Sequence, residues 1–278
     1  MNIIHDKMEP GVFSPGIYDC YSNAEYHAHE AVSKSGLDLI HQTPMHYRES
    51  LLRGTEETPA MKFGSAFHAA ILEPQVFSDT YDEVPGDRRL KAVREAIKDK
   101  EAAGKIILST DDYERIAQMR YALLDTKIGA VLRKAPMKEH SVFAEVDGVK
   151  VKCRPDACVP DKRIIFDLKT TADASPEAFA KSVARYRYHV QDAFYRLVVA
   201  QAAGINADDL AFVFVAVETA PPYGIAFYTL DDAAKLQGWV EAREDLRTYR
   251  AAAEKNEWRG YSPKIETLSL PRWAMAMD

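Results

Sequence analysis

The chain has 278 residues, of which 47% are hydrophobic and 28% charged, and its formal net charge at pH 7 is −6. This length and composition predict a soluble globular protein with an ample core, and the negative charge argues against a generally basic surface that coats nucleic acid, while still allowing a local basic groove. No apolar run approaches the length of a membrane span, and the first residues carry no signal-peptide segment, so we expect a cytoplasmic protein with no membrane partner.

The first half of the chain is predicted to be mostly helical. Residues 1–30 contain several proline and glycine breakers and are expected to be irregular, whereas 33–52 should form a helix or a helix pair interrupted at Thr43-Pro44. A short helix rich in small residues covers 61–73 and ends before Pro74. His68 lies on this helix, and its glycine and alanine neighbours would let the imidazole reach a sheet, although a single histidine on such a face is more often a hydrogen-bonded core residue.

A charged helix is predicted over residues 86–105. Its basic residues fall on one stripe, which consists of Lys91, Arg94, Lys98 and Lys105. A charge run of this kind is usually a solvated face, and the alternative is a strip that contacts phosphates.

The second half is predicted to combine strands and helices. The elements expected in chain order are helices over 109–124 and 128–133, a strand over 140–146, a hairpin over 149–171, helices from 175 and over 191–203, strands over 212–217 and 225–230, and a helix over 231–253. Gln191 and Tyr195 are one helical turn apart and therefore share a face. The tail that follows is expected to pack on the body.

The stretch 149–171, VKVKCRPDACVPDKRIIFDLKTT, is typical of a β-hairpin with a first arm over 150–159 and a turn at 160–163. If the turn is centred between its two middle residues, Val159 pairs with Ile164 and Asp156 pairs with Asp167. The three cysteines, Cys20, Cys153 and Cys158, form no Cys-x-x-Cys pair and are expected to be reduced thiols. Cys153 and Cys158 should face opposite ways along the first arm.

The pairing would bring two carboxylates together, with Cβ atoms about 5 Å apart. Their repulsion is about 3 kcal/mol at an effective dielectric constant of about 20, so removing Asp167 should maintain or raise the stability of the metal-free protein. Lys169 shares the face of Asp167, and the Leu168 carbonyl remains near both acids. Such a set of groups favours a hard cation and hydrolytic chemistry. An ordinary surface ion pair at a strand end, or a bulge that breaks the opposition, is the alternative.

Together these motifs resemble the restriction-endonuclease-like nucleases with the PD-(D/E)xK motif, which stands here as Pro155-Asp156 followed by Asp167-Leu168-Lys169. His68 on the upstream helix and Gln191-x-x-x-Tyr195 on the downstream helix resemble the RecB-like branch. Within that branch, the stretch 33–37 (SKSGL) followed by Pro44 and Tyr47, then the stretch 64–68 (GSAFH) and the hairpin, are similar to RecE-type exonucleases, exodeoxyribonuclease VIII. The resemblance covers roughly residues 17–273, and its specificity lies in separated motifs that occur in the right order.

The resemblance implies an α/β fold with a restriction-endonuclease-like core, in which a mixed central sheet is flanked by helices. It further implies one nuclease domain over 1–278, with an N-terminal helical elaboration over roughly 1–60 and a C-terminal tail over roughly 255–278. Some RecB-branch relatives hold an iron–sulfur cluster on four cysteines, one of which lies just before the motif proline that corresponds to Pro44 here. Thr43 stands at that position here, and three cysteines do not supply four ligands, so we expect no cluster.

The activity implied is Mg²⁺-dependent hydrolysis of DNA phosphodiester bonds, with Mn²⁺ able to substitute. The implied metal ligands are His68, Asp156, Asp167 and the Leu168 carbonyl. Lys169 would orient the attacking water, and Gln191 and Tyr195 would contact the substrate backbone or support the site.

RecE-type enzymes degrade duplex DNA from the 5′ end and leave a 3′ single strand for recombination. They form a tetrameric ring and work with a RecT-like single-strand annealing protein, and the resemblance implies the same properties for a bacterial or phage-encoded protein here. The alternatives are a RecB-branch nuclease that acts on single strands and a catalytically silent DNA-binding scaffold on the same fold. A filled set of catalytic positions argues against the silent scaffold.

Overall fold

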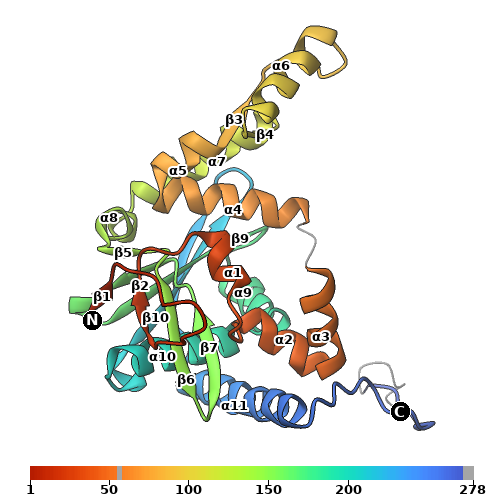
Figure 1. Ribbon diagram of the computed structural model, residues 1–278. Helices are drawn as coiled ribbons and strands as arrows, with labels where there is room; N and C mark the ends of the chain where they lie inside the picture. Colours follow the sequence, from red (N-terminus) through yellow and green to blue (C-terminus); the bar gives the residue numbers. More distant parts are fainter. Residues whose placement is uncertain (55–57, 272–278) are drawn as a thin grey trace, which may run out of the picture.

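The computed structural model describes residues 1–54 and 58–271. Within these residues, the centre of the fold is a five-stranded mixed sheet that lies between two groups of helices (Figure 1). In spatial order its strands are β11 (Ile225–Tyr228), β10 (Ala211–Glu218), β9 (Ile164–Thr171), β8 (Ala157–Val159) and β5 (Met137–Lys138). β9 and β10 run parallel, and the other neighbours run antiparallel. The predicted mixed central sheet is confirmed.

The two faces of the central sheet are covered by different helices, because side chains alternate along each strand. On one face, Phe166 and Leu168 of β9 share a core with buried residues of three helices. These helices are α4 (Pro59–Leu72), α7 (Thr110–Leu124) and α8 (Lys127–Lys134). On the other face, Ile165 packs in a core with residues of three further helices. They are α9 (Pro176–Arg185), α10 (Tyr188–Ala203) and α11 (Asp232–Lys255).

The N-terminal segment is not only irregular and helical, as its sequence predicted. It supplies strands to a second, four-stranded sheet among the described residues, in which β1 (Ile3–Ile4) and β2 (Gly16–Tyr18) continue the hairpin of β6 (Ser141–Val146) and β7 (Val149–Cys153). A helix α1 (Asn23–Ala28) follows β2. The strands form because β2 pairs with the free edge of β6 and becomes buried there, a long-range pairing that no local pattern reveals.

The interruption predicted at Thr43 is confirmed. α2 (Lys34–Gln42) begins after Ser33, whose side chain accepts a hydrogen bond from the Gly36 amide, and ends at Thr43. The same threonine caps α3 (Pro44–Arg53), in which proline occupies the first helical position. One residue therefore ends one helix and begins the next.

An arm protrudes from the body between α4 and α7 (Figure 1). It contains α5 (Pro74–Thr80), the parallel pair β3 (Tyr81–Glu83) and β4 (Ile106–Leu108), and α6 (Lys91–Ala102). Lys91, Arg94 and Lys98 are exposed on α6. Lys105 lies beyond the helix and donates to the carbonyls of Ser78 and Asp79 at 2.8 Å, so the predicted basic stripe has three members instead of four.

The predicted hairpin has the expected register but not a continuous first arm. Val159 pairs with Ile164 as predicted. The arm 150–159, however, is divided into β7 and β8, which belong to different sheets, because Pro155 has no amide to donate to a ladder. The same division overturns the expected opposite orientation of Cys153 and Cys158, which are both buried in one core. The second arm is β9, which remains paired with β10 through Thr171.

The first residues after α11 pack on the body. Trp258 stacks on Tyr47 with ring centroids 5.9 Å apart, and the Tyr261 ring lies 5.7 Å from that of His46. The described residues after 261 are exposed. In the described part of the chain, no helix is both long enough and apolar enough to cross a membrane.

Candidate functional site

A cavity of about 530 Å³ opens between α2, α4 and α10. Four residues that the sequence singled out line it, namely His68, Asp156, Gln191 and Tyr195. Asp167 and Lys169 do not lie on its wall, and Asp167 is only 2% exposed. The structure therefore brings the predicted residues together in two layers, with one pair behind the cavity wall.

Asp156 lies one residue before β8, at the break that Pro155 makes between the two sheets. Its Oδ2 accepts a hydrogen bond of 2.5 Å from the Leu168 amide, and its Oδ1 lies 3.5 Å from His68 Nδ1. Burial raises the pKa of Asp156, but His68, Lys169 and the Leu168 amide together outweigh burial and lower it below its ordinary value. The carboxylate is thus held in its charged form, next to β9 but outside the strand ladder.

Asp167 and Lys169 form a buried ion pair on the face of β9 that looks toward α10. Asp167 Oδ1 lies 2.5 Å from Lys169 Nζ, and its Oδ2 accepts a 2.7 Å hydrogen bond from Gln191 Nε2. Burial and the nearby Asp156 raise the pKa of Asp167, whereas Lys169 opposes them. The Lys169 ammonium also lies 4.6 Å from the centre of the Tyr188 ring. Each acid of the predicted pair therefore has its own cationic neighbour.

His68 reaches the sheet from α4, as the small residues of that helix predicted. Its Nε2 lies 3.0 Å from the Leu168 carbonyl oxygen, while Nδ1 faces Asp156. Burial lowers the pKa of His68, but Asp156 more than compensates and raises it to about 9. In the metal-free protein a protonated imidazole thus bridges two of the predicted metal-binding groups.

Glu139 belongs to the same cluster, and the sequence did not reveal it. It lies between β5 and β6, 17 residues before Asp156 in the chain, and is not part of any motif that the sequence shows. In the structure, ligand atoms of His68, Glu139 and Asp156 all lie within 4.8 Å of one another. Burial, with a further contribution from Asp156, raises the pKa of Glu139 to about 7.

Tyr195 is half-buried on the cavity wall, one turn after Gln191 on α10. Burial raises its pKa well above the ordinary value for a phenol, so the side chain is neutral and offers an O–H donor. Its ring and the Phe212 ring make an edge-to-face contact at 6.0 Å between centroids, which fixes the tyrosine ring against the core.

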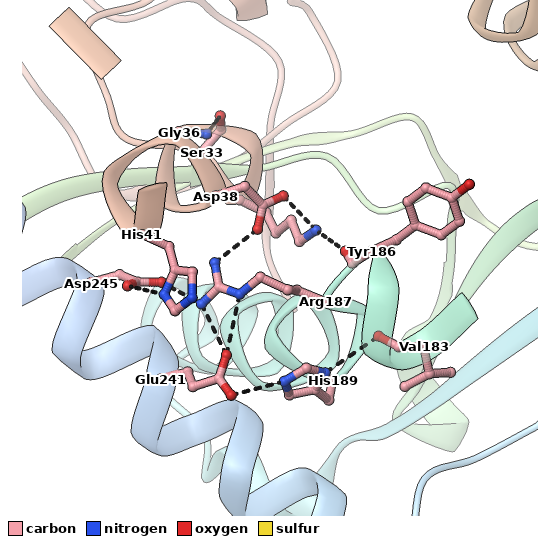
Figure 2. A network of polar contacts seen from close by, with 11 residues as sticks. Ser33, Gly36, Asp38, His41, Val183, Tyr186, Arg187, His189, Glu241 and Asp245 are labelled. Atoms are coloured by element: carbon pink, nitrogen blue, oxygen red, sulfur yellow. Dashed lines mark hydrogen bonds and ion pairs between the residues drawn. The ribbon is translucent and has the colours of Figure 1, made fainter. Parts of the chain in front are cut away.

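A network of ion pairs fixes the start of α10, which carries Gln191 (Figure 2). Arg187 precedes the helix in a left-handed conformation, with φ of 53°. Its guanidinium contacts Asp38 of α2 at 3.0 Å, and Glu241 and Asp245 of α11 at 3.1 and 2.6 Å. The network therefore joins α2 and α11 to Arg187 at the start of α10, four residues before Gln191.

The donor set of the cavity suits a small divalent cation. Two carboxylates and an imidazole nitrogen converge, and the Leu168 carbonyl lies beside them. Oxygen-rich sites of this kind hold Mg²⁺, and a nitrogen ligand also suits Mn²⁺. Asp167 is not part of this three-residue cluster, and its part in cation binding remains a prediction.

Comparisons with known proteins agree with this architecture. The family model for a PDDEXK-like domain of unknown function (DUF3799) matches residues 33–271, whereas no curated protein matches the sequence. A solved structure of a candidate exonuclease from Eubacterium rectale aligns with a TM-score of 0.63 at 16% identity, over 90% of this chain and 95% of that chain. A second, SSO0001, aligns with a TM-score of only 0.29 at 18% identity, over 66% and 85%. The first likeness confirms the restriction-endonuclease-like core, and the family match shows that the chain belongs to the PDDEXK-like domain family.

Proposed function

We propose that this protein is a divalent-cation-dependent nuclease that hydrolyses DNA phosphodiester bonds. The observation that carries the proposal is the convergence of His68, Glu139 and Asp156 in one cavity, with the Asp167–Lys169 pair directly behind it. Family membership and the fold shared with a candidate exonuclease support a nuclease.

The roles proposed for the residues follow from their contacts. A Mg²⁺ or Mn²⁺ ion held by His68, Asp156, Asp167 and the Leu168 carbonyl would supply an activated water and offset charge on the phosphate. The Lys169 ammonium, already oriented by Asp167, would position the attacking water or a phosphate oxygen.

The two residues on α10 would support the site and the substrate. Gln191 orients Asp167 through its hydrogen bond, and the neutral Tyr195 hydroxyl would donate to the DNA backbone at the cavity wall.

More narrowly, we infer a RecE-type exonuclease that degrades duplex DNA from the 5′ end. Two stretches that resemble RecE support this inference, because Ser33–Ser35 at the start of α2 and the two residues Ser65 and His68 on α4 line the same cavity. We further propose that the whole chain acts as one nuclease unit in the cytoplasm, without an iron–sulfur cluster. A tetrameric ring and a RecT-like annealing partner complete this proposal.

The experiment that tests the proposal uses purified protein, Mg²⁺, and duplex or single-stranded DNA labelled at either end. We expect loss of the 5′-labelled strand of the duplex from its 5′ terminus, with EDTA abolishing the reaction. Degradation of single strands alone would support the RecB-branch alternative. Binding without any cleavage, in Mg²⁺ or Mn²⁺, would support the silent scaffold and contradict our proposal.

Charge reversal on the arm tests whether it contacts DNA. In a Lys91→Glu/Arg94→Glu/Lys98→Glu variant, we expect weaker binding to long duplexes. The slope of log K against the logarithm of the salt concentration should become less steep, by up to about 0.9 for each phosphate that the variant no longer neutralises. The effect should be small, because Glu95, 3.6 Å from Lys91, already offsets part of the charge. The measurement is duplex affinity over a series of salt concentrations, and an unchanged slope would identify α6 as a solvated face.

A further inference from the structure

Glu139 combines an unusual backbone conformation with a largely buried acidic side chain. Its backbone lies in the left-handed region with φ of 52°, which residues with a side chain seldom adopt without compensation from their surroundings. The side chain is 18% exposed, although nearby Asp156 carries the same charge. A buried carboxylate is costly unless it is paired or coordinates a cation, and in this cavity Arg154 contacts only one of the two Glu139 oxygens.

Arg154 holds one oxygen of this carboxylate and leaves the other free. Its Nε donates to Glu139 Oε2 at 3.0 Å, and Nη1 donates to the Tyr21 carbonyl and Ser141 Oγ, each at 3.2 Å. Arg154 is therefore anchored to separate segments. Among the described residues, Oε1 of Glu139 receives no hydrogen bond, and the residue lines the cavity.

We propose that Glu139 is a ligand of the divalent cation in this cavity and that Arg154 is the positioning residue that presents it. The inference rests on the proposed function and extends the ligand set that the sequence motif implied. The Arg154 guanidinium has no lone pair to offer a cation, so it acts only by orienting the carboxylate. Partners of this kind in the outer shell fix the direction of a ligand and tune the affinity of the site.

The proposed set also determines which cations are preferred. Oxygen ligands alone favour Mg²⁺ and Ca²⁺, whereas the imidazole of His68 adds affinity for transition metals. With Glu139 and Asp156 as two charged oxygen donors beside that nitrogen, Mn²⁺ should bind more tightly than Mg²⁺ to the protein without DNA.

The test measures cation binding directly, by calorimetric titration of the full chain with Mn²⁺ in the absence of DNA. Glu139→Gln keeps the shape and the acceptor for Arg154, and we expect it to raise the Kd for Mn²⁺ at least about tenfold. Arg154→Gln should raise the Kd by about tenfold as well, with Arg154→Lys recovering part of the loss. Melting temperatures of the metal-free variants show whether each remains folded.

Glu73→Gln is the matched control, because Glu73 lines the same cavity but lies outside the three-residue cluster. It removes the same charge and should leave the Kd unchanged. An equal loss of affinity in Glu73→Gln would show general electrostatic attraction and overturn the inference. An unchanged Kd in Glu139→Gln would also overturn it, even if the wild-type protein degrades DNA. Failure of the wild-type protein to degrade DNA would instead contradict the proposed function.

Discussion

The rate of cation-dependent DNA cleavage should fall by at least about 10²-fold in an Asp167→Asn protein. Even the loss of a residue that only orients a metal ligand typically lowers metal affinity or activity by about 10- to 100-fold. Asparagine keeps an oxygen that can accept the hydrogen bond from Gln191, so the fold around β9 should be retained. It removes the charge that both a cation and Lys169 require. The measurement is the initial rate of duplex degradation at saturating Mg²⁺, and full residual activity would remove Asp167 from the site.

The stability of the corresponding alanine variant is expected to differ from what the sequence alone suggested. The predicted opposition of two acids implied that removing one would relieve repulsion. In the structure, Asp156 still raises the pKa of Asp167, but Asp156 faces His68 and the Leu168 amide, and Asp167 is paired with Lys169. Asp167→Ala would leave Lys169 buried without its partner, which should destabilise the metal-free protein by about 3 kcal/mol. Chemical denaturation of the wild-type protein and of Asp167→Ala, both without metal, measures this difference.

Replacing His68 and replacing Lys169 by alanine should change the nuclease rate in different ways. His68→Ala removes a nitrogen ligand but leaves Asp156 and Asp167, so excess Mg²⁺, or Mn²⁺ with its higher affinity for such sites, should restore part of the rate. Lys169→Ala removes an ammonium that positions water and offsets charge. We therefore expect a rate reduced by about 10²- to 10³-fold at saturating metal.

A titration of nuclease rate against metal concentration distinguishes the two roles. The concentration for half-maximal rate should rise in His68→Ala and should stay constant or fall in Lys169→Ala, because a positive neighbour of Asp167 is gone. Lys162→Ala, on the short helix between β8 and β9, is a control that removes a lysine from the same hairpin. If metal rescues Lys169→Ala but not His68→Ala, the two assignments are reversed.

Much of the local structure follows from the sequence because the signals involved are local. The Ser33 and Thr43 side chains accept hydrogen bonds from amides three residues ahead, so they cap α2 and α3 where the sequence predicted a helix from residue 33 and an interruption at Thr43-Pro44. The pairing of Val159 with Ile164 follows from the turn residues between them. The alternation along β9 likewise places Asp167 and Lys169 on one face and Leu168 on the other, which determined the spacing of the candidate site.

The tertiary structure alone decided how the site is completed. Glu139 enters it from the connection between β5 and β6, and Asp156 lies in the break between β7 and β8, where it meets the Leu168 amide, so neither position follows from a local period. The N-terminal strands and the Arg187 network depend in the same way on surfaces that come together only when distant elements pack. The physical reason is that capping and alternation act over a few residues, whereas the approach of charged groups is set by sheets and helices far apart in the chain.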